Sequence, residues 1–343
     1  MALPNSSKRK KQRQLPGWQL VAIDMVAIGV SLCIFALFHH ALPREVQVPD
    51  VGINTPPPNQ YYTSAPTLAP NATPTPAVTD SQGNLVDTSG WWSSFPDKFT
   101  NGEVIQTENS YQSKNVNITV TKVQENGVTY YVQDIYIRRI ECFATYLAKD
   151  KFGQGITQSV LDMDSASGAI CAMNGDYYGS LLTYNVVIRN GKFYMSNPDG
   201  DVCVLFHNGE MKTYSKSEFN ADAVMAQGAY QAWCFGPALM ENGKAITQTD
   251  SNVKGLNPRS GIGYFEPGHY CFITVDGRQE GYSKGITMLD YAKVFEELGC
   301  VEAYNLDGGQ TAMMTFLDKV VNQPYKGGRK SSDILLIREW EEG

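Results

Sequence analysis

Most of this chain, from residue 91 onward, alternates short apolar runs with polar turns, a pattern that predicts strands. The segments VNITVTKV and VTYYVQDIYI flank Asn126-Gly127. This dipeptide favours the positive φ angles of two-residue turns, so it predicts a hairpin. The pattern recurs around Asn190-Gly191 and Asn208-Gly209. Strands dominate without a repeated strand–helix–strand order, so we expect one α+β domain over residues 91–343 with a mixed or antiparallel sheet.

Helical periodicity occurs in three segments of this domain: TQSVLDMDSAS, SKSEFNADAVMAQ and TMLDYAKVFEELG. The last segment has one apolar face, and Gly299 follows it as a stop signal. The residues predicted to form that face are Met288, Leu289, Ala292, Phe295 and Leu298.

An apolar run precedes the domain. From Trp18 to Phe38 the chain reads WQLVAIDMVAIGVSLCIFALF, which at about 1.5 Å per residue is long enough to cross a bilayer. Basic residues cluster before the run and Arg44 follows it closely. This asymmetry predicts a cytoplasmic tail over residues 1–17, a membrane anchor over 18–42 and an extracellular C-terminal domain at the cell membrane. A cleaved signal peptide is the alternative interpretation.

The segment between the predicted anchor and the domain is rich in proline. Residues 43–90 contain nine prolines, including Pro56-Pro57-Pro58. Such a composition keeps a chain extended and prevents it from burying a core. We therefore expect a stalk over residues 43–90.

The charge distribution argues against nucleic acid as a partner. Residues 1–42 hold five basic residues and one acid, which leaves 23 basic and 34 acidic side chains for the remainder. An acidic body cannot replace the counterions around a phosphate backbone.

Six of the seven cysteines lie in the predicted domain, each in an apolar run. There a free cysteine behaves as a small core hydrophobe, and a domain of this size does not need disulfides for stability. The chain has no CxxC motif, and His207 and His269 are isolated, so a zinc site is not expected.

Four segments place polar residues beside glycines where an apolar strand begins or ends. Such positions suit sites that need close backbone approach and fixed side chains. Any one Asp-Gly or Asn-Gly pair could be an ordinary turn, but two glycines within LDGGQT fit a ligand loop better. Neither GxxxxGK[ST] nor GxSxG occurs. The residues concerned are Asn174, Asp176, Arg259, Asp276, Arg278, Gln279, Asn305, Asp307, Gly308, Gly309 and Gln310.

These segments resemble the phosphodiester glycosidase family. The run from VDGRQ to LDGGQTAMM is similar to the family's core, NGDYY to its Asn-Gly-aromatic motif, NPRSGIGY to its arginine-containing strand and GGRKSSDILLI to its C-terminal strand. The resemblance covers residues 105–340 and implies hydrolysis of a sugar–phosphate diester at the anomeric carbon. Gln310 stands where the family usually has serine or threonine, and Asp176 where it often has glycine.

This reaction suggests a role for each residue type. Asp276 and Asp307 both end apolar strands and are the candidate catalytic carboxylates, because carboxylates stabilise an oxocarbenium-like state. Arg259, Arg278 and Arg329 can bind phosphate in bidentate geometry. Sugar hydroxyls could be held by Asn174, Asn305 and Gln279, and the rest of the substrate site is assigned to Asp176, Gly308, Gly309 and Gln310.

No cofactor is required for this chemistry, although Asn174, Asp176, Asn305 and Asp307 offer oxygen ligands for calcium or magnesium. The predicted partner is a carbohydrate or glycosyl phosphate in an envelope or extracellular polysaccharide. Two alternatives share the same fold: a non-catalytic carbohydrate-binding module, to which Gln310 points, and an envelope-assembly protein. Clustered aspartates and arginines favour the enzyme.

Overall fold

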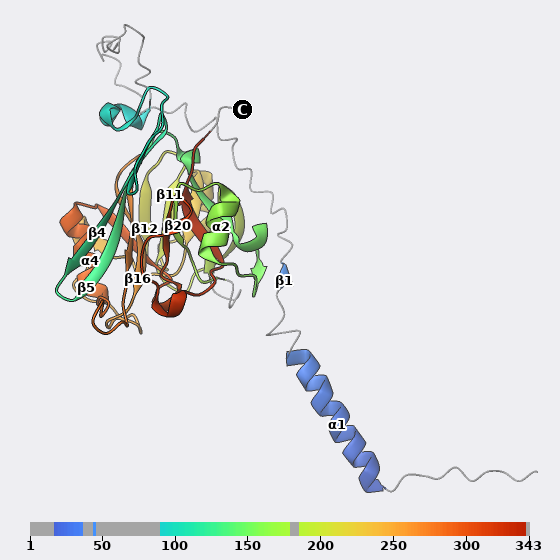
Figure 1. Ribbon diagram of the computed structural model, residues 1–343. Helices are drawn as coiled ribbons and strands as arrows, with labels where there is room; N and C mark the ends of the chain where they lie inside the picture. Colours follow the sequence, from blue (N-terminus) through green and yellow to red (C-terminus); the bar gives the residue numbers. More distant parts are fainter. Residues whose placement is uncertain (1–16, 37–43, 46–89, 179–184, 341–343) are drawn as a thin grey trace, which may run out of the picture. The chain divides into compact units, whose positions relative to one another are not determined.

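A computed structural model describes residues 17–36, 44–45, 90–178 and 185–340 (Figure 1). The chain divides into two compact units, Met1–Pro43 and Arg44–Gly343. The predicted tail over residues 1–17 and stalk over residues 43–90 lie almost entirely outside the described residues.

The described part of the first unit is the helix α1 (Gly17–Ala36), at the place of the predicted apolar run. Among the described residues, no helix combines the length and the apolar character needed to cross a membrane. The predicted anchor over residues 18–42 extends past α1 into residues 37–42, which lie outside the described residues, and it stays a prediction.

Three antiparallel sheets form the second unit. The first sheet has seven strands, in the spatial order β18 (Glu302–Leu306), β16 (Arg259–Glu266), β17 (His269–Val275), β5 (Val128–Ile137), β4 (Val116–Glu125), β3 (Ser110–Gln112) and β2 (Ile105–Gln106). The second has five, in the order β10 (Lys192–Asn197), β9 (Asn185–Arg189), β13 (Ala229–Trp233), β11 (Val202–Phe206) and β12 (Met211–Tyr214). The third also has five, in the order β20 (Lys319–Val320), β19 (Met314–Phe316), β8 (Cys171–Asn174), β21 (Asp333–Ile337) and β6 (Phe143–Leu147).

Shorter elements complete the unit. Two strand pairs stand apart, β1 (Arg44–Glu45) with β7 (Gly153–Gln154) and β14 (Met240–Glu241) with β15 (Lys244–Ala245). The 3-10 helices are η3 (Trp91–Ser94), η4 (Pro96–Lys98), η5 (Ile140–Cys142), η6 (Ala148–Asp150), η7 (Gly309–Thr311) and η8 (Tyr325–Gly327). Every strand pairing within the described ranges is antiparallel. The expected sheet-dominated α+β fold is confirmed, in its antiparallel form.

The predicted hairpin turns are present. Asn126 (φ 50°) and Gly127 (φ 73°) connect β4 to β5, and Asn190 (φ 51°) and Gly191 (φ 76°) connect β9 to β10. These are the positive φ angles that a two-residue turn needs to match the twist of its strands. Asn208-Gly209 lies in a longer turn between β11 and β12, where Gly209 has a φ of 80°.

All three predicted helices form, as α2 (Val160–Ser167), α3 (Ala221–Ala226) and α4 (Met288–Leu298). In α4 the Thr287 side chain accepts a hydrogen bond from the Asp290 amide at 3.2 Å, and Gly299 ends the helix in the left-handed conformation. Leu298 does not belong to the buried face of α4, since 42% of it is exposed at the last turn. The buried residues of the helix are Met288, Tyr291, Ala292, Val294 and Phe295.

One hydrophobic core joins the three sheets. The Phe143 ring of the third sheet packs edge-on against Phe272 of the first, with ring centroids 5.6 Å apart. It also lies 6.2 Å from the ring of Trp233 in the second sheet. Because a close-packed interior resists deformation, strand ends that are far apart in the sequence are held at fixed positions. A second cluster packs α4 against the seven-stranded sheet.

The six cysteines of this unit are buried and carry no disulfide bond. Cys271 and Cys300 come close, with their Sγ atoms 3.8 Å apart. Burial raises the pKa of the Cys142 thiol to about 12.

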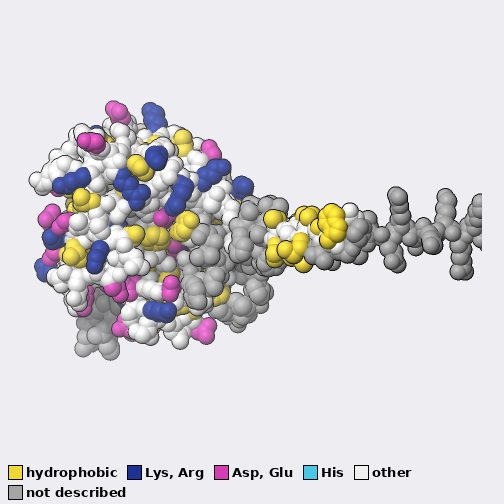
Figure 2. Space-filling view, turned by 90° about the horizontal axis from the view of Figure 1, so that it is seen from below, with side chains coloured by type: hydrophobic (Ala, Val, Ile, Leu, Met, Phe, Trp, Pro, Cys, Tyr) yellow, Lys and Arg dark blue, Asp and Glu magenta, His cyan; other side chains and the backbone are white. Residues whose placement is uncertain are grey.

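At the surface, Figure 2 shows lysine and arginine side chains interspersed with aspartate and glutamate, without a continuous basic strip on that face.

Candidate active site

A cavity of about 280 Å³ lies where β18 ends and β16 begins. Eight of the twelve predicted site residues line it: Arg259, Arg278, Asn305, Asp307, Gly308, Gly309, Gln310 and Arg329. Phe235, Val253, Asn257, Pro258 and Leu306 complete the lining. The cavity therefore unites segments that lie up to about 90 residues apart in the sequence.

Strand pairing and two glycines shape this cavity. Ser260 in β16 is opposite Leu306 in β18, so Arg259 and Asp307 lie at neighbouring strand ends. A Cβ atom on Gly308 would come 2.6 Å from the Pro258 carbonyl oxygen. Gly309 has a φ of 63° and donates its amide to the same oxygen at 3.0 Å. Only glycine allows both the close approach and the left-handed backbone at low cost.

Asp307 is the carboxylate that lines the cavity. Its Oδ2 accepts a hydrogen bond from Arg329 Nη2 at 2.8 Å, and only 7% of the residue is exposed. Burial raises the pKa of Asp307 above its ordinary value, while Arg329 and the Thr311 hydroxyl oppose that rise. Arg329 Nε donates to Thr311 Oγ1 at 2.8 Å, and its guanidinium lies 4.8 Å from the centre of the Tyr177 ring. The carboxylate is thus held in one orientation by a clamped arginine.

Arg259 is a buried cation without a carboxylate partner among the described residues. Only 3% of it is exposed. Its Nη2 donates to the carbonyls of Val253 and Gly255 at 2.6 and 2.7 Å. No ion pair of Arg259 with a carboxylate occurs in the described part of the chain. Burial, reinforced by repulsion from Arg278, lowers the pKa of Arg259 to about 10. An anion in the cavity would stabilise this charge.

Arg278 adds a second cation at the cavity. It adopts a positive φ of 59°, and its Nε and Nη2 donate to Asn257 Oδ1 at 3.2 and 2.6 Å. Its guanidinium packs over Gly309, where an added Cβ would lie 3.4 Å from Nη1 and Nη2. Among the described residues it forms no ion pair with a carboxylate.

Asn305 supplies an open acceptor. Its Nδ2 donates to the Gly236 carbonyl at 2.7 Å, whereas its buried Oδ1 has no hydrogen-bond partner among the described residues. Because burying an unpaired acceptor costs about 1–3 kcal/mol, a ligand hydroxyl that donates to Oδ1 would be favoured. Gln310 is already engaged, since its Nε2 donates to the Gly328 carbonyl at 3.0 Å.

Asp276 and Gln279 do not line the cavity. The Asp276 carboxylate is 1% exposed and accepts hydrogen bonds from Tyr282 Oη, Asn322 Nδ2 and the Gln323 amide, at 2.8–2.9 Å. Gln279 exchanges hydrogen bonds with Gln323 at 2.7 and 2.8 Å. The two predicted catalytic carboxylates therefore do not line the same cavity, and the oxygens of Asp276 are occupied by Tyr282 and the 322–323 segment.

Asn174 and Asp176 also lie outside the cavity lining. The Asp176 oxygens accept the amides of Tyr177 and Cys234 at 2.6 and 3.1 Å. Arg189, which pairs with Asp333 at 2.7 Å, lies 3.8 Å from the same carboxylate. Burial raises the pKa of Asp176 to about 6. This arrangement ties β8, β9 and β21 together behind the site.

Asn174 joins three segments beneath Asp307. Its Nδ2 donates to the Asp307 carbonyl at 2.6 Å, and its Oδ1 accepts from Ser260 Oγ at 2.7 Å and from the Met313 amide at 3.1 Å. The oxygens of Asn174 and Asp176 are therefore engaged in hydrogen bonds. Of the four residues considered for a divalent cation, Asn305 and Asp307 line the cavity. No cluster of three or more His, Cys, Asp or Glu side chains suited to a metal occurs among the described residues.

We expect Asn174→Ala to lower both stability and kcat, because it leaves the partners of the amide unsatisfied at about 1–3 kcal/mol and loosens the Asp307 backbone. Asn322→Ala is the matched control: Asn322 is also a buried amide outside the cavity lining, but it bonds Asp276 and Met314 and makes no hydrogen bond to Asp307. Urea denaturation and steady-state kinetics should show similar stability losses and a larger fall in kcat for Asn174→Ala. Equal falls in kcat would mean that Asn174 acts through stability alone.

The raised pKa of Asp307 predicts a pH dependence. Activity that needs the ionised carboxylate is lost as pH falls through the pKa of the folded protein, so the acid limb of kcat/KM should lie above the ordinary aspartate value of about 3.9. Because Arg329 lowers this pKa, Arg329→Gln should move the limb to higher pH. Lys326→Gln, which removes a cation outside the cavity lining, should leave it in place. If the acid limb does not move in Arg329→Gln, it reports the ionisation of a group other than Asp307.

Sequence reasoning missed several participants: Thr311, which orients Arg329; Tyr177, which stacks on it; and Asn257, which holds Arg278. Thr311 directly follows the Gly-Gly-Gln run, and Tyr177 belongs to NGDYY, so both were within reach of the motifs. Asn257 is the first residue of NPRSGIGY and was within reach in the same way.

Comparisons with known proteins match this region. The profile of the family described as Phosphodiester glycosidase matches residues 167–338, a range that contains all twelve predicted site residues. The SPbeta prophage-derived uncharacterized protein YomE of Bacillus subtilis (strain 168) is 29% identical over 237 residues, or 62% of this chain and 36% of that protein. This chain thus spans about a third of the length of that curated relative.

A solved structure shares the fold. The catalytic domain of zebrafish N-acetylglucosamine-1-phosphodiester alpha-N-acetylglucosaminidase, auto-inhibited by its pro-peptide, matches with a TM-score of 0.54 and 16% identity. The match covers 71% of this chain and 86% of the zebrafish chain. At this identity the likeness concerns the fold.

Proposed function

Because this chain belongs to the phosphodiester glycosidase family, we propose that it hydrolyses the bond between the anomeric carbon of a sugar and a phosphodiester. The observation that carries the proposal is the buried Arg259, which no carboxylate among the described residues neutralises and which lines the same cavity as Asp307. A buried cation without a carboxylate partner favours binding of an anion such as phosphate. The Asp307 carboxylate in the same cavity can stabilise positive charge on a sugar.

In this proposal the phosphate binds at the arginines. Arg259 and Arg278 are cations without carboxylate partners among the described residues, and charge-assisted hydrogen bonds from such groups to phosphate oxygens are strong. The leaving group is a phosphate monoester, whose second pKa is about 6. It departs without a strong general acid, so stabilisation by cations replaces proton donation.

In the same proposal the sugar lies over Asp307. Its ionised carboxylate would stabilise the positive charge that develops at the anomeric carbon as the bond to phosphate breaks. Asp307 is the one carboxylate in the cavity lining that the structure describes, and one is sufficient for a leaving group that needs no acid. Asn305 Oδ1 would accept a hydrogen bond from a sugar hydroxyl.

The proposal extends to where the protein acts. We expect an envelope or extracellular polysaccharide as substrate and a location at the cell surface. Both expectations rest on the sequence, through the basic residues before the apolar run and the proline-rich segment over 43–90.

A panel of sugar-1-phosphodiesters, beginning with those of N-acetylglucosamine, would test the proposal. We expect release of free sugar and a phosphate monoester from at least one member, detected by chromatography and phosphorus NMR. Release of the sugar 1-phosphate and the free alcohol would instead indicate a phosphodiesterase, which cleaves the other ester bond. Binding of sugars without turnover across the panel would favour a non-catalytic carbohydrate-binding module.

A further inference from the structure

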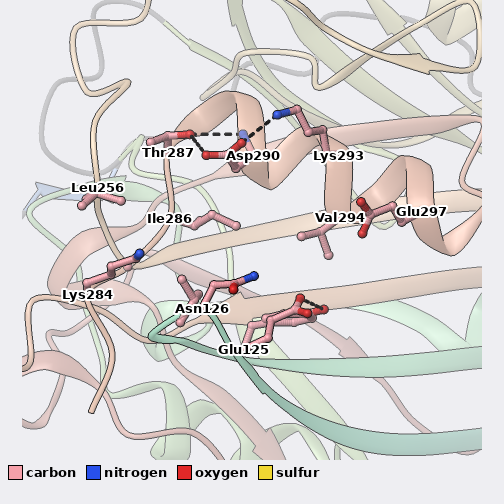
Figure 3. Close-up of a pocket in the computed structure, with 13 residues that line it drawn as sticks. Glu125, Asn126, Leu256, Lys284, Ile286, Thr287, Asp290, Lys293, Val294 and Glu297 are labelled. Atoms are coloured by element: carbon pink, nitrogen blue, oxygen red, sulfur yellow. Dashed lines mark hydrogen bonds and ion pairs between the residues drawn. The ribbon is translucent and has the colours of Figure 1, made fainter. Parts of the chain in front are cut away.

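A second cavity, of about 360 Å³, lies between α4 and the tip of the β4–β5 hairpin. Figure 3 shows Lys293 and Glu297 of α4 on one side, Glu125 of the hairpin on the other, and Ile286 and Val294 between them. The volume falls within the range of about 300–1,000 Å³ that is typical of ligand sites.

Only a thin wall separates this cavity from the candidate active site. Asn257 and Ile286 face each other across the wall and exchange two backbone hydrogen bonds, at 3.0 and 3.1 Å. Asn257 lines the active-site cavity, whereas its chain neighbour Leu256 lines the second. The carbonyl of Ile286, a residue of the second cavity, accepts a hydrogen bond from Arg259 Nε at 3.4 Å. A ligand that extends over the paired backbones of Asn257 and Ile286 would therefore reach from one cavity into the other.

The rim of the wall carries exposed apolar side chains. Val253 is 53% exposed and lines the active-site cavity, and Leu256 is 49% exposed and lines the second. Covering such side chains releases them from water and is favourable. Both would be covered by a ligand that spans the two cavities.

The lining of the second cavity is amphipathic. Val128, Ile286 and Val294 are buried apolar residues of its lining, and the polar groups include the carboxylates of Glu125 and Glu297. Asp290 and Lys293 neutralise each other at 2.8 Å, whereas Lys284 forms no ion pair with a described side chain. Sugars combine apolar C–H faces with hydroxyl groups that carboxylates accept, so this mixture suits a glycan.

The volumes of the two cavities indicate which part of the substrate each one can hold. The active-site cavity, of about 280 Å³, is slightly smaller than the usual range of about 300–1,000 Å³, and it has room for the reacting sugar and phosphate. We propose that the second cavity binds the glycan that continues beyond the scissile phosphodiester. This inference rests on the proposed function, and it makes phosphate-linked oligosaccharides or polymers better substrates than small diesters.

The test compares two substrates with the same reacting group. One is N-acetylglucosamine-1-phosphate esterified to methanol, and the other carries a mannotriose on the phosphate through a 6-hydroxyl. We expect the full-length protein to have a KM at least about fivefold lower for the trisaccharide diester, which corresponds to about 1 kcal/mol of binding at 1.4 kcal/mol per decade.

Variants at exposed positions locate the effect without disturbing the core. Leu256→Ala and Lys284→Ala should each raise KM for the trisaccharide diester and leave the methyl diester unchanged within about twofold. Leu298→Ala and Lys244→Ala are matched controls, since Leu298 is 42% exposed, the Lys244 side chain is 78% exposed, and neither lines the second cavity. These two control variants should leave KM unchanged for both diesters.

The possible results separate the two proposals. Hydrolysis of both diesters with equal KM, or a preference that Leu256→Ala and Lys284→Ala do not reduce, would overturn the glycan site and leave the proposed function intact. If neither diester is hydrolysed, the proposed function fails for this sugar, and calorimetry with the trisaccharide diester tests the cavity directly. Binding that is weaker in Leu256→Ala than in Leu298→Ala would support the glycan site. Equal or absent binding would contradict it.

Discussion

Asp307→Asn should abolish most sugar release, lowering kcat by at least about 100-fold, while the protein keeps its melting temperature. The amide preserves the shape of the side chain but removes the negative charge that would stabilise an oxocarbenium-like transition state. Stability should be retained because burial already disfavours the charged form of Asp307. The Arg329 partner has a side chain that is 42% exposed, so water can solvate it when the ion pair is lost.

Asp276→Asn is a matched control for this experiment. Asp276 is also a buried aspartate that follows an apolar strand and precedes glycine, yet its oxygens bind Tyr282, Asn322 and Gln323 outside the cavity lining. An asparagine can accept at only one of its two terminal atoms, so this variant should lose stability and keep much of its kcat. The opposite pattern would make Asp276 the reacting carboxylate and Asp307 a structural turn residue.

The second large effect concerns the leaving group. We expect a preference of at least about 100-fold for a sugar-1-phosphodiester over the nitrophenyl glycoside of the same sugar. Both leaving groups depart readily, but only phosphate offers anionic oxygens to the guanidinium groups. Hydrogen bonds to charged groups contribute about 1.5–3 kcal/mol each, so two of them give about two decades at 1.4 kcal/mol per decade.

Arg278 is the position at which to test this preference. Arg259 is buried among carbonyls and Arg329 holds Asp307, so replacing either would disturb the site itself. Arg278 is exposed and is held by Asn257. Arg278→Leu should therefore reduce the preference and leave the slow nitrophenyl reaction nearly unchanged, and Arg278→Lys should restore it only in part, since lysine lacks the planar fork.

Arg138→Leu serves as the control, because the Arg138 guanidinium lies on the Trp92 ring, 3.9 Å from its centre, and does not line the cavity. Its kinetics should match those of the unchanged protein on both substrates. Comparable rates on the two substrates in the unchanged protein would contradict a phosphate site at the arginines and leave an ordinary glycosidase pocket.

Features that depend on neighbouring residues were predictable from the sequence. Asn126-Gly127 and Asn190-Gly191 form the predicted turns because the preference for positive φ belongs to the dipeptide itself. Thr287 and Gly299 delimit α4 because capping satisfies backbone groups within one helical turn. The apolar face of that helix was predicted only in part. Leu298 is exposed because local periodicity does not specify where the packing partner ends.

The membership of the site was only partly predictable. Asp276 and Asp307 have nearly the same local pattern, an apolar strand followed by Asp-Gly, and the second glycine after Asp307 is the local difference between them. The distinction comes from distant segments. Residues 322–323 saturate the Asp276 oxygens, whereas Arg329 approaches Asp307 at the open cavity.

The sequence by itself determined the strands, the turns, the helices and the residue types that can react, because backbone stereochemistry and hydrophobic periodicity act over a few residues. Only the tertiary structure decided that Arg259, Arg278 and Arg329 meet Asp307 at one cavity, and that Asn174 and Asp176 support it from behind. The pairing of β16 with β18 and the shared core of the three sheets fix those distances. Burial at the start of β16 leaves Arg259 without a carboxylate partner among the described residues, a property that no local segment of the sequence contains.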